Sequence, residues 1–171
     1  SGSGVSRDPE QGLRWIRASA IQGNADAQFR LGLMFANGTG VERDDRQAVA
    51  WYQKAASAGS VSAQTNLGAR YAAGAGVQQD FGLALDWFRK AAEQGDASAQ
   101  FNLGVMYANG SGTPADPVEA FKWLALAAAS AHGVERRRYA EARDTVVRSM
   151  TQEQVADAQS RANEWRRSKK P

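Results

Sequence analysis

The sequence repeats itself every 36 residues, three times over and without a gap. The columns of the repeat hold Ala-Gln and Leu-Gly pairs, the pattern Gly-x-Gly, an aspartate, a tryptophan and an Ala-Ala pair. In the first copy these are Ala27-Gln28, Leu31-Gly32, Gly38, Gly40, Asp44, Trp51 and Ala55-Ala56. A period of this length is typical of stacked-repeat proteins, in which no unit can bury its apolar face alone. We therefore expect a solenoid whose units contact only their neighbours along the chain.

Each repeat predicts two helices, which we name helix A and helix B. Helix A spans about residues 25–37 in repeat 1, where apolar residues recur at the i, i+4, i+7 and i+8 spacing of a buried stripe. The two glycines after it favour a helix stop, because glycine tolerates the left-handed conformation. Helix B begins after Asp44, whose carboxylate can accept bonds from the first free amides, and it stops near Gly59. The fold class expected is all-α, with nine helices in antiparallel pairs that form a right-handed superhelix.

The two ends of the chain depart from the full repeat. Residues 8–23 align with helix B alone, since Asp8, Trp15 and Gly23 fall in its columns. After His132 two further helices are expected. The first covers residues 134–149, with Val134, Tyr139, Ala142, Val146 and Val147 facing inward. The second covers residues 152–167 and follows a capping box at Thr151–Gln154. We interpret this pair as a cap, because a terminal unit must present a polar outer face.

These patterns divide the chain into seven segments. They are a linker-like segment over 1–7, a half repeat over 8–23, repeats over 25–60, 61–96 and 97–132, a helical cap over 133–168, and a tail over 169–171.

Composition narrows the classes of function. The chain has no cysteine, which excludes disulfides, zinc–thiolate sites and thiol catalysis. It has no apolar run long enough to cross a bilayer, so we expect no direct membrane insertion. Residues 133–171 hold ten Lys and Arg against six Asp and Glu, whereas the whole chain has a formal charge of +3. The basic excess therefore belongs to the C-terminal end.

The repeated columns resemble the Sel1-like repeat, a relative of the tetratricopeptide repeat. The resemblance covers about residues 8–168, and repeat 3 departs from it at Thr113, Leu126 and Ala131, where valine, lysine and glycine are usual. It implies an α-solenoid of the bacterial type that acts as a non-catalytic module for binding protein or peptide partners. Bacterial members of this family are often exported and act as adaptors or regulators in envelope processes and signalling.

Glycine recurs in the middle of helix A, at Gly32, Gly68 and Gly104. Each costs about 1 kcal/mol relative to alanine, so a packing reason is required. We predict that helix B approaches closely there, with the indole of Trp51, Trp87 or Trp123 filling the space nearby. We also expect the five tryptophans to belong mainly to the core.

No set of residues suited to catalysis or metal binding occurs at helical spacing in the sequence. His132 is the single histidine, and no nucleophile, base and orienting group fall together. We therefore expect no catalytic residue, no cofactor and no metal. The Gly-x-Gly pairs follow a helix rather than a strand, so they are interpreted as turns and not as phosphate loops. The aromatic columns are not interleaved with Lys or Arg, which disfavours nucleic-acid binding.

The resemblance to tetratricopeptide repeats implies a concave binding surface made by helix A. The positions carried over are Asp26, Phe29, Leu33 and Asn37 in repeat 1, Thr65 and Ala69 in repeat 2, and Phe101, Val105 and Asn109 in repeat 3. Phe29 and Phe101 would be apolar anchors, and the two asparagines would bond a peptide backbone. The alternative is that Phe29 and Leu33 simply pack helix A against its neighbours.

Basic residues near the C-terminus leave two interpretations open. Arg136–Arg138 and the stretch 166–170 are either a solvated cap face with a loose tail, or contacts for an acidic partner or anionic lipid.

The leading hypothesis is a module that holds a protein or peptide partner on the helix-A face, in an adaptor or regulatory role in a bacterial envelope or signalling process. The alternative is a structural or oligomerisation segment of a larger protein, with homo-oligomers forming through the N-terminal edge. A periplasmic or otherwise exported location is expected, with the cytoplasm as the alternative.

Overall fold

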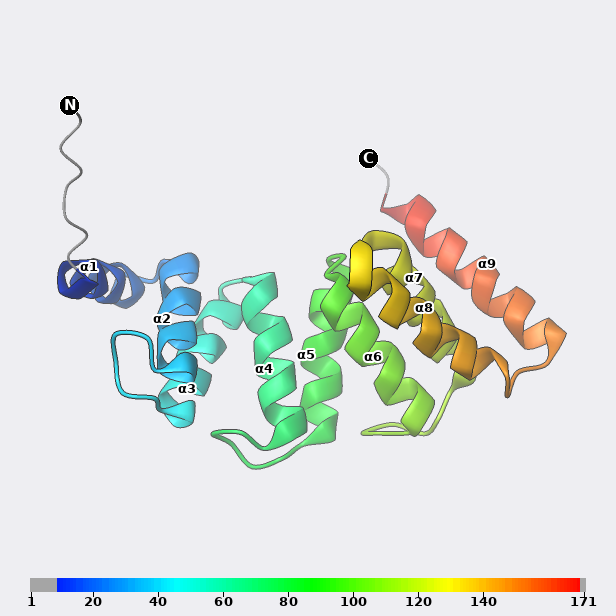
Figure 1. Cartoon of the computed structure of the whole chain (residues 1–171), viewed down its shortest axis with the longest axis horizontal. Coiled ribbons are helices and arrows are strands. Elements are labelled where there is room, and N and C mark those ends of the chain that lie inside the picture. Colours follow the sequence, from blue (N-terminus) through cyan, green and yellow to red (C-terminus); the bar gives the residue numbers. More distant parts are fainter. Residues whose placement is uncertain (1–8, 170–171) are drawn as a thin grey trace. The chain divides into compact units, whose positions relative to one another are not determined.

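The computed structural model describes residues 9–169, and every regular element in that range is helical (Figure 1). Nine helices occur there: α1 (Pro9–Ile21), α2 (Ala25–Asn37), α3 (Asp45–Ser57), α4 (Val61–Ala73), α5 (Phe81–Glu93), α6 (Ala97–Asn109), α7 (Pro117–Ser130), α8 (Gly133–Val147) and α9 (Gln152–Ser168). The all-α prediction is confirmed. Helices α2, α4 and α6 are the A helices, while α1, α3, α5 and α7 are the B helices. The predicted linker over residues 1–7 lies outside the described residues.

The chain divides after Gln79 into two compact units. In the first unit, α2 packs against α1 and α3, and α3 also packs against α4. In the second unit, α6 packs against α5 and α7, and α7 in turn contacts both α8 and α9. Short connections make sequential helices antiparallel neighbours, which is how a helix with one apolar stripe finds a partner.

The helix ends follow the predicted turn chemistry. The Asp44 carboxylate accepts from the backbone amides of Arg46 and Gln47 at 2.9 and 3.0 Å. Asp116 does the same at the start of α7, where Pro117 occupies the first turn. Gly38 closes α2 in the left-handed region at φ 70°, and its amide donates to the Met34 carbonyl. The Gly-x-Gly pairs therefore end helices, as predicted.

A buried glutamine column links each B helix to the following A helix, a role that the sequence did not predict. The Nε2 atoms of Gln28, Gln64 and Gln100 each donate to a carbonyl eight residues earlier, at 3.1, 3.3 and 3.1 Å. Those carbonyls belong to Ala20 and Ala56 at the ends of α1 and α3, and to Ala92 in the last turn of α5. Each carbonyl also accepts from the backbone amide of the glycine three residues later, at 3.1, 3.1 and 3.0 Å. The glutamine therefore adds a second hydrogen bond, which ties the end of each B helix to the next A helix.

The mid-helix glycines do mark close helix contacts, but the predicted partner is wrong. A Cβ atom on Gly32 would lie 2.7 Å from the Tyr52 ring, and one on Gly104 would lie 2.7 Å from Cγ of Leu124. In each case the large side chain is the residue after the tryptophan, because that position points directly at helix A. Gly68 is buried as well.

The second glycine of the α4–α5 connection packs on the start of α3. A Cβ atom on Gly76, whose φ is 80°, would lie 2.2 Å from the carbonyl oxygen of Asp45. The Asp45 carboxylate also accepts from Arg70 of α4 at 2.6 Å. Its hydrogen bond with Arg43, and then that with Arg70, hold the pKa of Asp45 below its ordinary value. Backbone packing and an ion pair therefore join α3 to the helix and loop that follow it.

The C-terminal cap has the predicted helices and one wrong residue. The capping box of Thr151 and Gln154 is present at the start of α9. Tyr139, Ala158 and Ala162 are buried. Val134, however, is 72% exposed. It lies five residues before Tyr139, which places it about 140° away around α8 at 100° per residue.

The basic C-terminal stretch is helical as far as Ser168, so the loose-tail interpretation is wrong for Arg166–Ser168. Arg166 is half-buried, and its Nη2 atom contacts the Ala125 carbonyl at 3.4 Å. Lys169 follows as the C-cap, and the last two residues of the predicted tail lie outside the described range.

Candidate functional site

In the first unit, two of the predicted helix-A residues share a hollow. Leu33 and Asn37 of α2 line a space of about 360 Å³ together with Ile16 of α1, Met34, Arg30 and Thr39. We call this space the α2 hollow. Ile16, Leu33 and Met34 make its surface mainly apolar, and the exposed Asn37 side chain offers amide donors and an acceptor beside them.

The other predicted residues of this unit differ in exposure. Phe29 is half-buried, and its ring centroid lies 5.9 Å from that of the buried Tyr52. Part of its surface is therefore used in packing. Asp26 and Ala69 are exposed, whereas Thr65 is half-buried and donates to the Val61 carbonyl at 3.2 Å.

In the second unit, Phe101 is joined to the cap. Its ring stacks on that of Tyr139, with centroids 4.5 Å apart, and the Arg138 guanidinium carbon lies 4.6 Å from the Phe101 centroid. Burial, and a hydrogen bond to the Glu135 carboxylate, raise the pKa of Tyr139. Val105 is half-buried and Asn109 is exposed. Of the three predicted residues here, Asn109 is therefore the one with a polar and exposed side chain.

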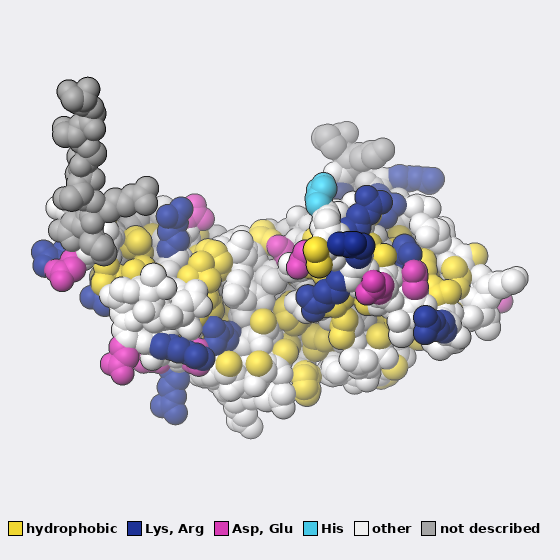
Figure 2. All heavy atoms as spheres, in the orientation of Figure 1, with side chains coloured by type: hydrophobic (Ala, Val, Ile, Leu, Met, Phe, Trp, Pro, Cys, Tyr) yellow, Lys and Arg dark blue, Asp and Glu magenta, His cyan; other side chains and the backbone are white. Residues whose placement is uncertain are grey.

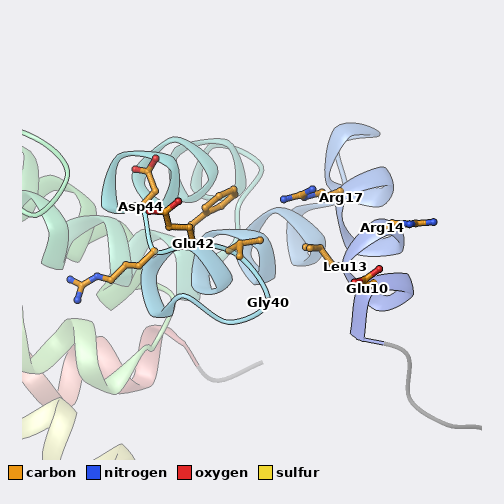
Figure 3. A pocket seen from close by; sticks show the side chains of 10 residues that line it. Glu10, Leu13, Arg14, Arg17, Gly40, Glu42 and Asp44 are labelled. Atoms are coloured by element: carbon orange, nitrogen blue, oxygen red, sulfur yellow. The ribbon is translucent and has the colours of Figure 1, made fainter.

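A larger hollow of about 720 Å³ lies between α1 and the α2–α3 connection (Figure 3). We call it the α1 hollow. The side chain of Arg17 points toward the connection that carries Glu42, whereas the side chain of Arg14 points away from it. The lining carries charges of both signs, and Leu13 and Phe35 contribute apolar surface.

The repeat frame explains why Arg17 differs from its counterparts. Gln53 and Arg89 occupy the same column, and they donate to the hydroxyls of Tyr71 and Tyr107 at 3.1 and 3.0 Å. The aromatic residue next to Arg17 in this frame is Phe35, which has no hydroxyl. The link that joins neighbouring repeats elsewhere cannot form at α1.

Trp15 on α1 is an exception to the expectation that the tryptophans belong mainly to the core. Trp15 is 72% exposed and Ile21 is 76% exposed, whereas Trp123, in the same repeat column as Trp15, is 4% exposed. Trp51 and Trp87 are half-buried, each beneath a lysine ammonium, at 4.0 and 4.2 Å from the ring centroid. The sequence columns could not reveal this difference, because Trp15 falls in the same repeat column as its counterparts.

Outside these hollows, the described residues offer few candidates for catalysis or metal binding. His132 is exposed and precedes α8 without making a side-chain cap. Within residues 9–169, no group of three or more His, Asp or Glu side chains is arranged to hold a metal ion. None of the helices in that range has the length and apolar character needed to cross a bilayer.

Comparison with known protein families identifies Sel1 repeats over residues 1–24, 25–60, 61–96 and 97–132. The chain belongs to the Sel1 repeat family. Sel1 repeats are generally non-catalytic modules of protein interaction. A search among curated proteins finds no significant match to this Sel1 repeat chain.

Two solved bacterial structures are similar to this Sel1 repeat protein. A Sel1 repeat protein from Oxalobacter formigenes is 36% identical, with a TM-score of 0.73 over 81% of this chain and 57% of its own. The protein c5321, described as a protective antigen present in uropathogenic Escherichia coli strains and displaying an SLR fold, is 29% identical. Its TM-score is 0.57, over 95% of this chain and 42% of its own. This chain therefore spans 57% and 42% of the lengths of the two proteins.

Proposed function

We propose that this Sel1 repeat chain binds a protein or peptide partner through its helix-A residues. The α2 hollow is the observation that carries the proposal. Its apolar lining from Ile16, Leu33 and Met34 suits one apolar side chain of a partner. The adjacent Asn37 amide suits a hydrogen bond to the partner backbone. Such a combination of an apolar pocket and a few polar groups is common in peptide recognition.

The remaining helix-A residues differ in how much exposed surface they can offer to a partner. Asp26, Ala69 and Asn109 are exposed and extend the contact surface on their own units. Phe29, Thr65, Phe101 and Val105 are half-buried, so each contributes only the part of its surface that packing leaves free. Leu33 and Asn37 line the α2 hollow, so we expect them to contribute more to binding than the two phenylalanines.

The test begins with affinity capture by this protein to identify the partner, followed by titration of the purified partner. The double substitution Leu33→Ser with Asn37→Ala should weaken binding by about tenfold or more, since losing a buried apolar contact typically costs about 2 kcal/mol. Helicity should be unchanged, because both residues keep part of their surface in solvent.

The control is the single substitution Arg137→Ala on α8. It removes one charge without touching the α2 hollow, and binding should stay within about twofold of wild type. Loss of binding in the arginine variant, with none in the Leu33 and Asn37 variant, would refute the proposal.

We further propose an adaptor or regulatory role in a bacterial envelope or signalling process. The proposed location is the periplasm, and the alternative location is the cytoplasm. The absence of cysteine is compatible with export, and the similar Escherichia coli protein is described as a protective antigen. Fractionation of cells that produce this protein would test the location. Recovery of the whole pool with cytosolic markers would contradict it.

A second candidate function is self-association through α1, as in a structural or oligomerisation segment. Trp15 and Ile21 favour it, because two large apolar side chains are largely exposed on one short helix. Sedimentation equilibrium should then show a molar mass above one chain, and Trp15→Ser should return the mass to that of one chain. A wild-type mass of one chain at all concentrations would exclude this candidate while leaving the partner-binding proposal intact.

A further inference from the structure

The C-terminal unit contains a hollow that the helix-A proposal does not use. It measures about 380 Å³ and lies among α7, α8 and α9, which places it within the size range of small-molecule sites. Its floor consists of Ala125, Ala128 and Ala129 of α7, and its rim carries Arg136 and Arg143 of α8 and Arg166 of α9. We call it the cap hollow.

The space exists because repeat 3 departs from the pattern of repeat 2. Ala125 and Ala129 stand in the columns that hold Arg89 and Glu93 one repeat earlier. Two long charged side chains are thus replaced by methyl groups. Ala129 is exposed there, whereas Ala125 and Ala128 are buried at the bottom of the space.

The charges around the cap hollow are unbalanced. Arg143 pairs with the adjacent Asp144 at 2.6 Å. Arg136 and Arg166 form no ion pair with any carboxylate of the described residues, and no Asp or Glu side chain is among the residues that line the hollow. On the face drawn in Figure 2, basic side chains gather over α8. The hollow therefore carries about two positive charges without a counter-ion from the described chain.

The α7 backbone helps to hold one of these arginines in place. Nη2 of Arg166 contacts the Ala125 carbonyl at 3.4 Å, directly at the floor of the hollow. Gln159 of α9 adds a neutral amide to the lining. A guanidinium group offers paired N–H donors that match the oxygens of a phosphate or carboxylate.

We infer that the cap hollow binds a phosphate monoester. Two unpaired guanidinium groups match the charge of about −1.5 to −2 that a phosphate monoester carries at neutral pH, whereas a carboxylate carries only one negative charge. Arg136 and Arg166 both line the hollow, which is why a single phosphate group is the ligand we infer for it. This site is separate from the α2 hollow and does not depend on the proposed partner-binding function.

The experiment is calorimetric titration of the whole chain at low salt with inorganic phosphate, with doubly capped O-phosphoserine, and with acetate as the monoanionic control. Both phosphate probes should bind, and acetate should bind at least about tenfold more weakly. Absence of binding by both phosphate probes, or equal binding of acetate, would overturn the inference.

Three variants test the location, and one matched control tests its specificity. Arg136→Gln and Arg166→Gln should each weaken binding of O-phosphoserine by about tenfold or more, because each removes charge-assisted hydrogen bonds. Ala129→Leu should weaken it similarly by filling the hollow without changing the charge. Arg137→Gln removes a charge from the same helix but does not line the hollow, so binding should change by less than about twofold. An equal loss in Arg137→Gln would show diffuse attraction to a basic surface and would overturn the site.

The source of the phosphate is distinguished by a short peptide that contains one phosphoserine. If it binds more tightly than capped O-phosphoserine, the ligand is a phosphorylated peptide, and if it binds equally, the ligand is a small phosphorylated molecule. Either result supports the site, provided that the unphosphorylated peptide does not bind. Binding only to vesicles of anionic lipid, with none to O-phosphoserine, would overturn it.

Discussion

Helix α1 and the helix pair α8–α9 are the two ends of the described chain, and they differ in how they finish the repeat pattern. On α1, Trp15 is 72% exposed, while Trp123 of α7, which contacts α8 and α9, is 4% exposed. The two tryptophans occupy the same repeat column. A repeat column therefore selects the side chain, but a neighbouring helix is needed to bury it.

Repeat 3 shows how the sequence adapts to a cap. Leu126 is buried, and it stands where Lys54 and Lys90 extend over tryptophan rings in the earlier repeats. Trp123 contacts Trp165 of α9 edge to face at 6.1 Å between centroids, and its indole donates to Glu119 at 3.1 Å. The lysine over Trp123 is instead Lys122, which lies 4.5 Å from the ring centroid and pairs with Glu119 at 3.0 Å. In α1 the same column holds Ala18, which is exposed.

The largest expected contrast is between Trp123 and Trp15. Trp123→Ala should lower the free energy of unfolding by about 3–5 kcal/mol, because it empties a buried site. Trp15→Ala should change it by no more than about 0.5 kcal/mol, as an exposed residue. Urea unfolding followed by far-ultraviolet circular dichroism measures both. A loss at Trp15 equal to that at Trp123 would show that α1 is covered in solution.

A second contrast concerns the equivalent loops inside repeats 1 and 2, which carry Gly40 and Gly76. Gly76→Ala should destabilise by about 3 kcal/mol, because its Cβ would meet the Asp45 backbone and its φ is positive. Gly40 has a similar φ of 71°, but the nearest atom to its Cβ would be Cε of Met34 at 3.4 Å. Gly40→Ala should therefore cost only the conformational strain of about 1–2 kcal/mol.

The same unfolding measurement compares these two variants. Equal losses would mean that the α2–α3 connection closes on α1 in solution, which would contradict the open α1 hollow.

The smallest contrast is between two helical glycines. Gly104→Ala should destabilise by about 1–2 kcal/mol, because the new methyl group would lie 2.7 Å from Leu124. Gly12 has no atom within 4 Å of an added Cβ, so Gly12→Ala should stabilise by up to about 1 kcal/mol through helix propensity. Thermal unfolding gives the sign of each change. Stabilisation of the chain by Gly104→Ala would show that α6 and α7 are less closely packed than the structure indicates.

The sequence by itself predicted the helices, because their determinants are local. The bounds 25–37 of α2, the aspartate caps and the glycine stops follow from spacing and from the backbone preferences of a few residues. The capping box of α9 is of the same kind. The repeat columns also indicated the Sel1 family, since three copies agree at many positions.

Only the tertiary structure decided which side chains share a surface. It joined Phe101 to Tyr139, turned Val134 to solvent, and placed Leu33 and Asn37 with Ile16 in one hollow. It also separated Arg136, which faces the cap hollow, from its neighbour Arg138, which lies over Phe101. Successive residues of a helix point about 100° apart, so a run of like residues does not predict a common partner. Periodicity specifies a helix and its apolar stripe, whereas the neighbour that covers the stripe depends on contacts distant in sequence.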